Sequence, residues 1–198
     1  DQTYLADALA RLGPGWIGVT QLPHDCPDAE IARLDALGVR AVRFNLFRGR
    51  IDEVDGIAAL ATRVHAIAAW TAEIYADAAT LAPHVDVLSK LPQLSIDHLG
   101  MTEAGLPVLL DLVASGCKVK ATGFGRVGLD VPATLEAIAR KSPAALVFGT
   151  DMPSTRAARP FRSADIDLVE QVLGVDLARK AFWDNPVALY RAGEPAAP

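Results

Sequence analysis

Residues 144–153 read AALVFGTDMP, an apolar run that ends in a glycine, a hydroxyl and a carboxylate before a proline. Five other β-rich runs precede it, spaced by about one strand plus one crossover helix. The six predicted strands are 16–21, 41–46, 71–76, 93–99, 118–122 and 145–150. Strands that alternate with helices in this way form a parallel sheet, so the fold class is predicted to be α/β.

Segments with apolar residues at three- and four-residue spacing, typical of amphipathic helices, separate the strands. They cover 29–37, 54–68, 104–114, 132–139, 166–173 and 177–190. The pattern leaves two architectures open, a doubly wound sheet and a (β/α)₈ barrel. The only glycine-rich turn after a strand, Gly123-Phe124-Gly125, lacks the third glycine of the dinucleotide fingerprint, which disfavours nucleotide binding.

The composition is that of a globular domain and excludes several kinds of partner. The net charge is −5, and the 19 Lys and Arg residues are scattered, which argues against nucleic acid and anionic membranes as partners. Cys26 and Cys117 match neither a zinc pattern nor a disulfide framework, so a reducing cytoplasm is expected. We expect one domain over 1–192, a tail over 193–198, and a core that contains Trp16, Trp70 and Trp183.

Polar side chains cluster near the carboxyl ends of five consecutive predicted strands. A barrel active site accounts for such a series, because these sites are assembled from strand ends at one mouth of the barrel. The residues are Arg43, Asn45, Glu73, Tyr75, His98, Lys118, Lys120, Thr122 and Asp151.

Structural roles remain open for several of these residues. Arg43 could be a buried ion-pair partner, and Lys120 could extend from a strand end toward solvent. Glu73 is expected to pair with Lys118 or Lys120 inside the barrel rather than to act in catalysis. Tyr75 taken alone is typical of a core tyrosine with a bonded hydroxyl.

His98 and Asp151 suggest catalytic chemistry more directly. A histidine at a strand end can polarise a substrate carbonyl, and an aspartate across the mouth can accept a proton from water. Both roles suit a hydrolysis in which negative charge develops on a carbonyl oxygen. Strand alternation places the neighbouring Asp97 on the face opposite His98.

Four stretches in matching order resemble the amidohydrolase superfamily, and within it the branch of 2-pyrone-4,6-dicarboxylate lactonases and sugar-lactone hydrolases. They are GVRAVRFN at 38–45, SIDHLG at 95–100, FGTDMP at 148–153 and DNPVALY at 184–190. The resemblance implies a (β/α)₈ barrel in which the six predicted strands are strands three to eight. Strands one and two would then lie upstream of Asp1.

The resemblance also implies roles for individual residues. Asp151 corresponds to the family's general base, and His98 to the histidine that polarises the scissile carbonyl. The family's substrate contacts correspond to Arg43, Arg48 or Arg50, Tyr75 and Arg126, and the planar fork of arginine suits carboxylates. Asn45 and Lys120 are added from the series of strand ends. The expected substrate-binding set is Arg43, Asn45, Arg48, Arg50, Tyr75, Lys120 and Arg126.

The sequence departs from the family pattern at two points. It contains no His-x-His pair, which many superfamily members use with residues like His98 and Asp151 to bind zinc or manganese. We therefore expect no required metal in this chain, and a divalent metal such as zinc only in a longer protein that supplies the pair. Met101 stands where the related lactonases have an arginine, which leaves the dicarboxylate substrate open.

These observations predict a cytoplasmic hydrolase that opens a carboxylated lactone without a metal or with weak metal dependence. A decarboxylase or lactone isomerase using the same residues is the alternative within the superfamily. A truncated, non-catalytic binding module is the alternative outside enzymes. Exposed barrel edges would favour a homo-oligomer.

Overall fold

The computed structural model describes residues 2–47 and 54–191, and its centre is a parallel sheet of six strands. Every predicted strand is present, and the order of strands in the sheet follows the order in the chain. The strands are β1 (Gly18–Thr20), β2 (Val39–Asn45), β3 (Thr71–Tyr75), β4 (Leu94–Ile96), β5 (Lys118–Ala121) and β6 (Leu146–Phe148).

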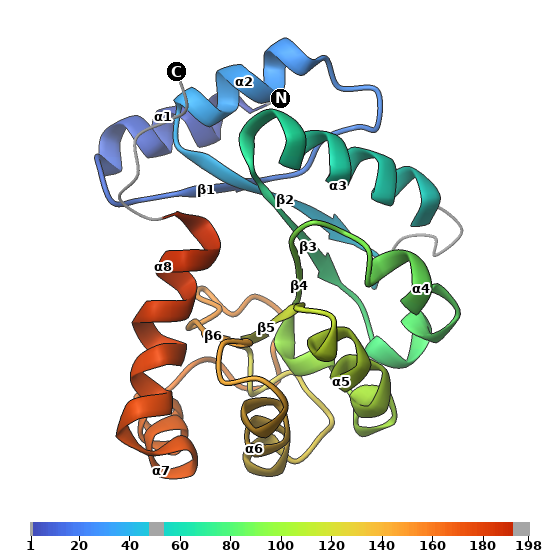
Figure 1. Cartoon of the computed structure of the whole chain (residues 1–198). Helices are drawn as coiled ribbons and strands as arrows, with labels where there is room; N and C mark the ends of the chain where they lie inside the picture. Colours follow the sequence, from blue (N-terminus) through green and yellow to red (C-terminus); the bar gives the residue numbers. More distant parts are fainter. Residues whose placement is uncertain (1, 48–53, 192–198) are drawn as a thin grey trace.

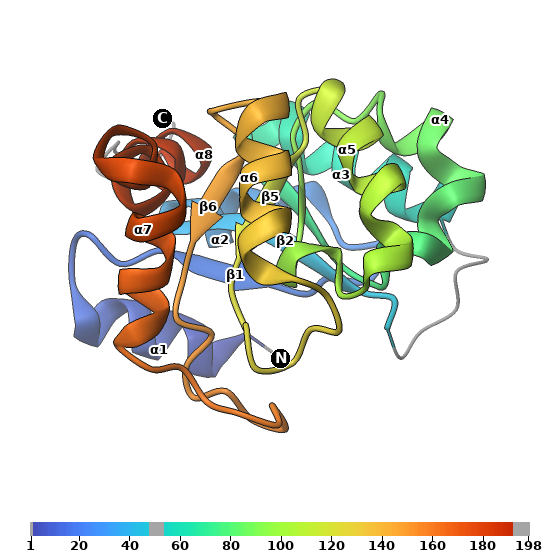
Figure 2. The same ribbon diagram turned by 90° about the horizontal axis from the view of Figure 1, so that it is seen from below.

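Helices connect successive strands and surround the outer face of the sheet (Figures 1 and 2). Helix α3 spans the predicted residues, whereas the turn after β3, a 3₁₀ helix at Ala78–His84 followed by α4, was not predicted. The α-helices are α1 (Thr3–Leu12), α2 (Asp28–Ala36), α3 (Val54–Ala68), α4 (Val85–Leu88), α5 (Leu106–Ala114), α6 (Val131–Lys141), α7 (Ala164–Arg179) and α8 (Asn185–Tyr190).

The sheet curls into a half-barrel, which distinguishes it from the open doubly wound alternative (Figure 1). Within the described residues β1 and β6 are its two edges and do not pair with each other. The six strands are consistent with part of a (β/α)₈ barrel. None of the helices in residues 2–47 and 54–191 has both the length and the apolarity that crossing a bilayer requires.

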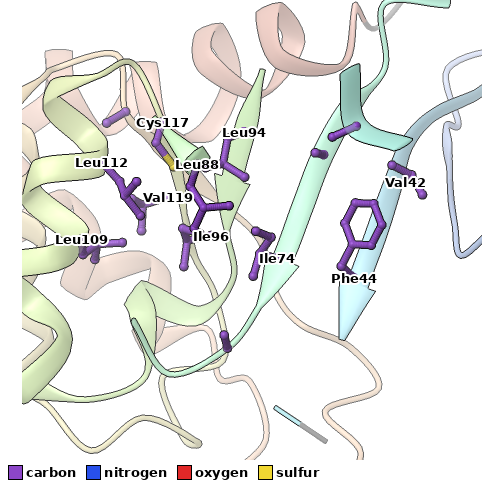
Figure 3. Packing of buried hydrophobic residues seen from close by; sticks show 14 of the residues in the cluster. Val42, Phe44, Ile74, Leu88, Leu94, Ile96, Leu109, Leu112, Cys117 and Val119 are labelled. Atoms are coloured by element: carbon purple, nitrogen blue, oxygen red, sulfur yellow. The ribbon is translucent and has the colours of Figure 1, made fainter. Parts of the chain in front are cut away.

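One face of the sheet is apolar and the other is polar and charged, because successive side chains of a strand point to opposite faces. On the outer face, Phe44, Ile74 and Ile96 belong to one buried hydrophobic cluster, which also contains Leu109 and Leu112 of α5 (Figure 3). On the inner face the strand register aligns charged and polar residues: Arg43 with Glu73, Glu73 with Ser95, and Ser95 with Lys118.

The tryptophans correct one sequence-based expectation. Trp70 is fully buried, and its indole donates a hydrogen bond to Asp35 Oδ1 at 2.9 Å. Trp16 and Trp183 are 60% and 66% exposed, so they are not core residues. Trp16 precedes the edge strand β1 and Trp183 lies in a π-helical turn before α8, where neither is covered by another described element.

The C-terminal helix α8 ties the end of the described chain to the middle of the sheet. The backbone oxygen of Leu189 accepts hydrogen bonds from Thr71 Oγ1 on β3 and Gln93 Nε2 before β4, both at 3.2 Å. At the start of the same helix, the Asn185 amide donates to the backbone oxygen of Leu146 at 2.8 Å. The motif at 184–190 therefore connects β3 with β6 across the half-barrel.

Candidate active site

A cavity of about 680 Å³ lies at the carboxyl ends of the strands. Its lining comes from the ends of β2 and β3 and from the segments that follow β4, β5 and β6. Six predicted site residues line this cavity: Arg43, Asn45, Tyr75, His98, Arg126 and Asp151. Lys120 is not part of the lining, and Arg48 and Arg50 lie outside the described residues.

His98 is held in a tight turn that begins where β4 ends. The backbone has a positive φ at His98 (51°), Leu99 (51°) and Met101 (74°), a conformation that is costly for residues other than glycine. Gly100 in the same turn also has a positive φ, and a Cβ there would lie 2.9 Å from Ala78 Cβ. This strained, tightly packed turn fixes the direction of the imidazole.

The imidazole of His98 is buried and has two neighbours in the site. Its Nδ1 lies 2.8 Å from Thr122 Oγ1, and its ring packs edge-on against Tyr75. Burial is the largest influence on His98 and lowers its pKa, although the nearby carboxylates of Asp97 and Asp151 act in the opposite direction. Burial therefore favours the neutral form of the imidazole.

The two oxygens of Asp151 have different surroundings. Oδ1 lies 4.0 Å from His98 Nε2. Oδ2 accepts two hydrogen bonds from Arg126, from Nε at 2.8 Å and from Nη2 at 2.5 Å. The backbone of Asp151 has a φ of 56°, again in the left-handed region. Arg126 thus fixes one oxygen and leaves the other directed toward the imidazole.

Arg43 is both a cavity residue and an ion-pair partner. Its Nε and Nη2 lie 2.8 and 2.7 Å from Asp97 Oδ2, and its guanidinium lies over the Tyr75 ring at 5.0 Å from the ring centroid. Asp97 follows the inner-face residue Ser95 by two positions, so strand alternation directs it inward. The turn with a positive φ at His98 then brings the imidazole into the cavity as well, so the expectation that Asp97 and His98 lie on opposite faces is wrong. Asp97 therefore supports Arg43 from inside the barrel.

Lys120 belongs to the same buried ionic network. Its Nζ lies 2.5 Å from Glu73 Oε2 and 3.2 Å from Asp97 Oδ1, and the Tyr190 hydroxyl donates to Glu73 Oε1 at 2.6 Å. Burial by itself would lower the pKa of Lys120, but the charges of Glu73 and Asp97 raise it above its usual range. Likewise, burial would raise the pKa of Asp97, but Lys120, Arg43 and His98 hold it below its ordinary value.

An aromatic wall and a single amide complete the cavity. Phe47 stacks on Tyr75 with ring centroids 5.1 Å apart and an angle of 12° between the planes. Asn45 also lines the cavity, and its buried Oδ1 has no hydrogen-bond partner among the described residues. That oxygen is available to accept a hydrogen bond from a water molecule or a ligand.

Four residues of the site received no functional role from the sequence. Thr122 contacts His98, and Asp97 contacts Arg43. Contacts between residues so far apart in the chain are not visible in a local sequence pattern. Phe47 and Arg156 come from segments without strand or helix periodicity, so no pattern marked them as cavity residues. All four either line the cavity or contact a residue that does.

The described residues do not fit a divalent metal. No group of three His, Cys, Asp or Glu side chains comes together in residues 2–47 and 54–191, whereas a catalytic zinc normally has three protein ligands. The two candidate ligands are His98 and Asp151, whose side chains lie 4.0 Å apart. The cation of Arg126 already binds Oδ2 of the Asp151 carboxylate. We therefore derive no catalytic step through a metal.

Comparison with known proteins identifies the relatives of the chain. The 2-pyrone-4,6-dicarboxylate hydrolase of Comamonas testosteroni is 25% identical over 219 residues, covering 96% of this chain and 72% of the relative. A Pseudomonas putida structure described as a 2-pyrone-4,6-dicarboxylic acid hydrolase matches with a TM-score of 0.82 and 24% identity, over 98% of this chain and 78% of that one. A second solved structure, from Acinetobacter baumannii, is likewise described as a 2-pyrone-4,6-dicarboxylic acid hydrolase and has citric acid bound. It matches with a TM-score of 0.73 and 19% identity, over 96% of this chain and 79% of that one.

The similarity to the solved structures identifies the half-barrel as part of the fold of these proteins. The amidohydrolase family model matches residues 1–192, which include all six strands and every residue that lines the cavity. The chain therefore belongs to the amidohydrolase family.

Proposed function

We propose that the protein is a lactonase, a hydrolase that opens a carboxylated cyclic ester by attack of water. The observation that carries this proposal is the placement of Asp151 Oδ1 4.0 Å from His98 Nε2, with both residues lining one cavity. This separation is too long for a direct hydrogen bond, so the two groups can act on different atoms of a bound ester and water. The name of the Comamonas relative supports the same reaction class.

In the proposed reaction, Asp151 Oδ1 accepts a proton from water as the water oxygen bonds to the lactone carbonyl carbon. His98 donates a hydrogen bond from Nε2 to the carbonyl oxygen, where negative charge develops. This requires the Thr122 hydroxyl to donate to Nδ1. When the tetrahedral intermediate collapses, the ring carbon–oxygen bond breaks and the proton held by Asp151 passes to the leaving oxygen.

The remaining cavity residues are proposed to orient the substrate. Arg43 and Arg126 each use Nε and Nη2 for a protein carboxylate, which leaves Nη1 of each without a bond to a described residue. Those donors, together with Asn45 and the face of Tyr75, can contact a planar acidic substrate. No substrate contact is proposed for Lys120, whose ammonium lies between Glu73 and Asp97.

The experiment is a hydrolysis assay with 2-pyrone-4,6-dicarboxylate, a sugar-acid lactone and a lactone without a carboxylate. Wild-type protein is compared with Asp151→Asn and with Asp111→Asn, an exposed residue of α5, as a matched control. Loss of the general base is expected to lower kcat by about 100- to 10,000-fold. The control should retain wild-type turnover.

Identification of the product separates the lactonase from its alternatives. A ring-opened acid with one added water supports the proposal. Release of carbon dioxide would indicate a decarboxylase, and a rearranged lactone an isomerase. Equal turnover by Asp151→Asn and wild-type protein would exclude Asp151 as the base.

A further inference from the structure

The arginines around the cavity differ in whether their charge is already neutralised. In the described part of the chain, three arginines line the cavity: Arg43, Arg126 and Arg156. The first two bind the carboxylates of Asp97 and Asp151. Arg156 makes no ion pair and no side-chain hydrogen bond with any described residue.

A substrate carboxylate that approached either paired arginine could use only Nη1, because Nε and Nη2 already bind a protein carboxylate. Arg126 makes two hydrogen bonds to Asp151, and its Nη2 also lies 3.4 Å from the backbone oxygen of Thr155. Arg43 shares Asp97 with Lys120. These guanidiniums hold the site together, and their positive charge is balanced within the protein. Arg156 keeps its full charge for a ligand.

The loop that carries Arg156 is fixed on both sides of this residue. Before it, the buried Ser154 donates from Oγ to the backbone oxygen of Asp151 at 3.1 Å and accepts from the backbone N–H of Phe161 at 3.3 Å. After it, Arg159 makes two hydrogen bonds to Asp165, at 3.0 and 2.9 Å. The side chain of Arg156 is therefore presented from a constrained backbone.

The backbone of this loop is also strained where it borders the cavity. Asp151, Ser154 and Arg156 have φ values of 56°, 57° and 68°, and none of them is glycine. Such conformations persist only where the surrounding structure enforces them, and they concentrate at functional sites. Arg126 contributes to this constraint, because it contacts both Asp151 and Thr155.

We propose that Arg156 is a specificity-determining residue that binds a carboxylate of the substrate at the rim of the cavity. This inference rests on the proposed lactonase function and adds the residue that selects acidic over neutral substrates. A planar guanidinium binds a carboxylate through two parallel hydrogen bonds, which supplies both attraction and orientation. Arg156 can do so without disrupting the ion pairs that hold Asp151 and Arg43.

The binding test uses citrate, an inert carboxylate, and isothermal titration calorimetry. Wild-type protein is compared with Arg156→Gln, Arg156→Lys and Arg162→Gln. Arg162 is exposed in the same loop but does not line the cavity, so its substitution makes the same charge change away from the site. Arg156→Gln is expected to raise the Kd by about tenfold to a hundredfold, because a charge-assisted pair is lost. Arg156→Lys should have a Kd for citrate between that of wild-type protein and that of Arg156→Gln. Arg162→Gln should change the Kd by less than about twofold.

The kinetic test asks whether the effect depends on the substrate carboxylate. Arg156→Gln should raise KM for a carboxylated lactone with little change in kcat, and the ratio of kcat/KM for a carboxylated lactone to that for a neutral lactone should fall by about tenfold or more. The inference is overturned if wild-type protein does not bind citrate, or if Arg156→Gln and Arg162→Gln bind it equally. Arg156-dependent citrate binding without hydrolysis of any lactone would contradict only the proposed function. Asp151-dependent hydrolysis with equal citrate binding by the two arginine variants would contradict only this inference.

Discussion

Arg43 and Lys120 hold the two different oxygens of one carboxylate, that of Asp97, at 2.7 Å from Oδ2 and 3.2 Å from Oδ1. Glu73 adds a second negative charge on Lys120, so two cations and two anions balance inside the half-barrel. Charges in such a setting are tolerated only when they are paired. The network therefore links the stability of the sheet interior to the position of an arginine in the cavity.

Substitution of Lys120 tests this link through stability. Lys120→Met leaves Glu73 and Asp97 without their shared cation and is expected to lower the free energy of unfolding by about 3–5 kcal/mol. Urea unfolding measures the change. Lys118→Met on the same strand is the control, because within residues 2–47 and 54–191 the Lys118 ammonium donates a hydrogen bond only to the backbone oxygen of Ala144. The double variant Glu73→Gln/Lys120→Met should lose less than the sum of its two single variants, and strict additivity would contradict the proposed coupling.

The pH dependence of stability is expected to reflect the burial of His98. Its pKa in the folded protein is lowered, so the unfolded chain binds a proton more readily as the pH falls through about 6.5. The free energy of unfolding should therefore decrease as the pH falls below about 6.5, and it should continue to decrease until the pH reaches the lowered pKa of His98 in the folded protein. Urea unfolding between about pH 8 and pH 5 measures this dependence.

The control for this pH effect is His98→Gln, which removes one titrating group and leaves the other three histidines in place. The variant should lose less stability than wild-type protein over the same pH range. A parallel decline of both proteins would show that other groups account for the pH dependence.

Thr122 is predicted to support catalysis by orienting the imidazole. Thr122→Val keeps the shape of the side chain but removes the hydrogen bond to His98 Nδ1. Since a hydrogen bond of this kind contributes roughly 1 kcal/mol, we expect kcat for the lactone to fall about fivefold with little change in KM. Thr134→Val replaces another buried threonine, on α6, and should keep wild-type kcat. Equal kcat values for the two variants would exclude the orienting role.

The contact between Gly125 and the loop after β6 offers a test of loop position. A Cβ at Gly125 would lie within 1.9 Å of the Arg159 backbone oxygen, so Gly125→Ala must displace that loop. We expect a loss of about 1–3 kcal/mol in stability and up to about a hundredfold in kcat/KM, because Asp151 and Arg156 move with the loop.

Gly128→Ala is the matched control for Gly125→Ala. It lies in the same segment after β5, and a Cβ there would meet no atom within 4 Å. Thermal unfolding and kcat/KM should stay close to wild-type values. Similar losses in the two variants would mean that the segment itself, rather than its contact with Arg159, controls the site.

Sequence periodicity predicted the repeated parts of the fold. The six strands and α3 follow from apolar spacing, because every strand needs an apolar outer face and every crossover helix an apolar stripe. The same regularity placed Arg43, Asn45, Tyr75 and His98 near strand ends, and these residues do line the cavity. Their chemical roles remain predictions.

The pair of Glu73 with Lys120 was among the expected contacts and is present, but other features that depend on long-range pairing were not predicted from the sequence. Asp97 and Lys120 are 23 positions apart in the chain, and the parallel pairing of β4 with β5 brings them to one network. The exposure of Trp16 and Trp183 depends on which neighbours cover the sheet edges, and no local pattern contains that information. The loop at 150–163 has no periodicity, so the position of Arg156 follows only from its fixed ends.

The strand order β1 to β6 has a consequence for how the chain folds. Because each strand pairs with the next one along the sequence, most of the sheet requires only the closure of short chain segments, which favours rapid folding. The bonds from α8 to β3 are the exception, joining residues 117 and 118 positions apart. Closing that segment costs more loop entropy than closing one strand–helix unit, and it brings Tyr190 onto the Glu73–Lys120 pair. The half-barrel can thus grow one strand–helix unit at a time, with its ionic interior completed when the two distant parts of the chain meet.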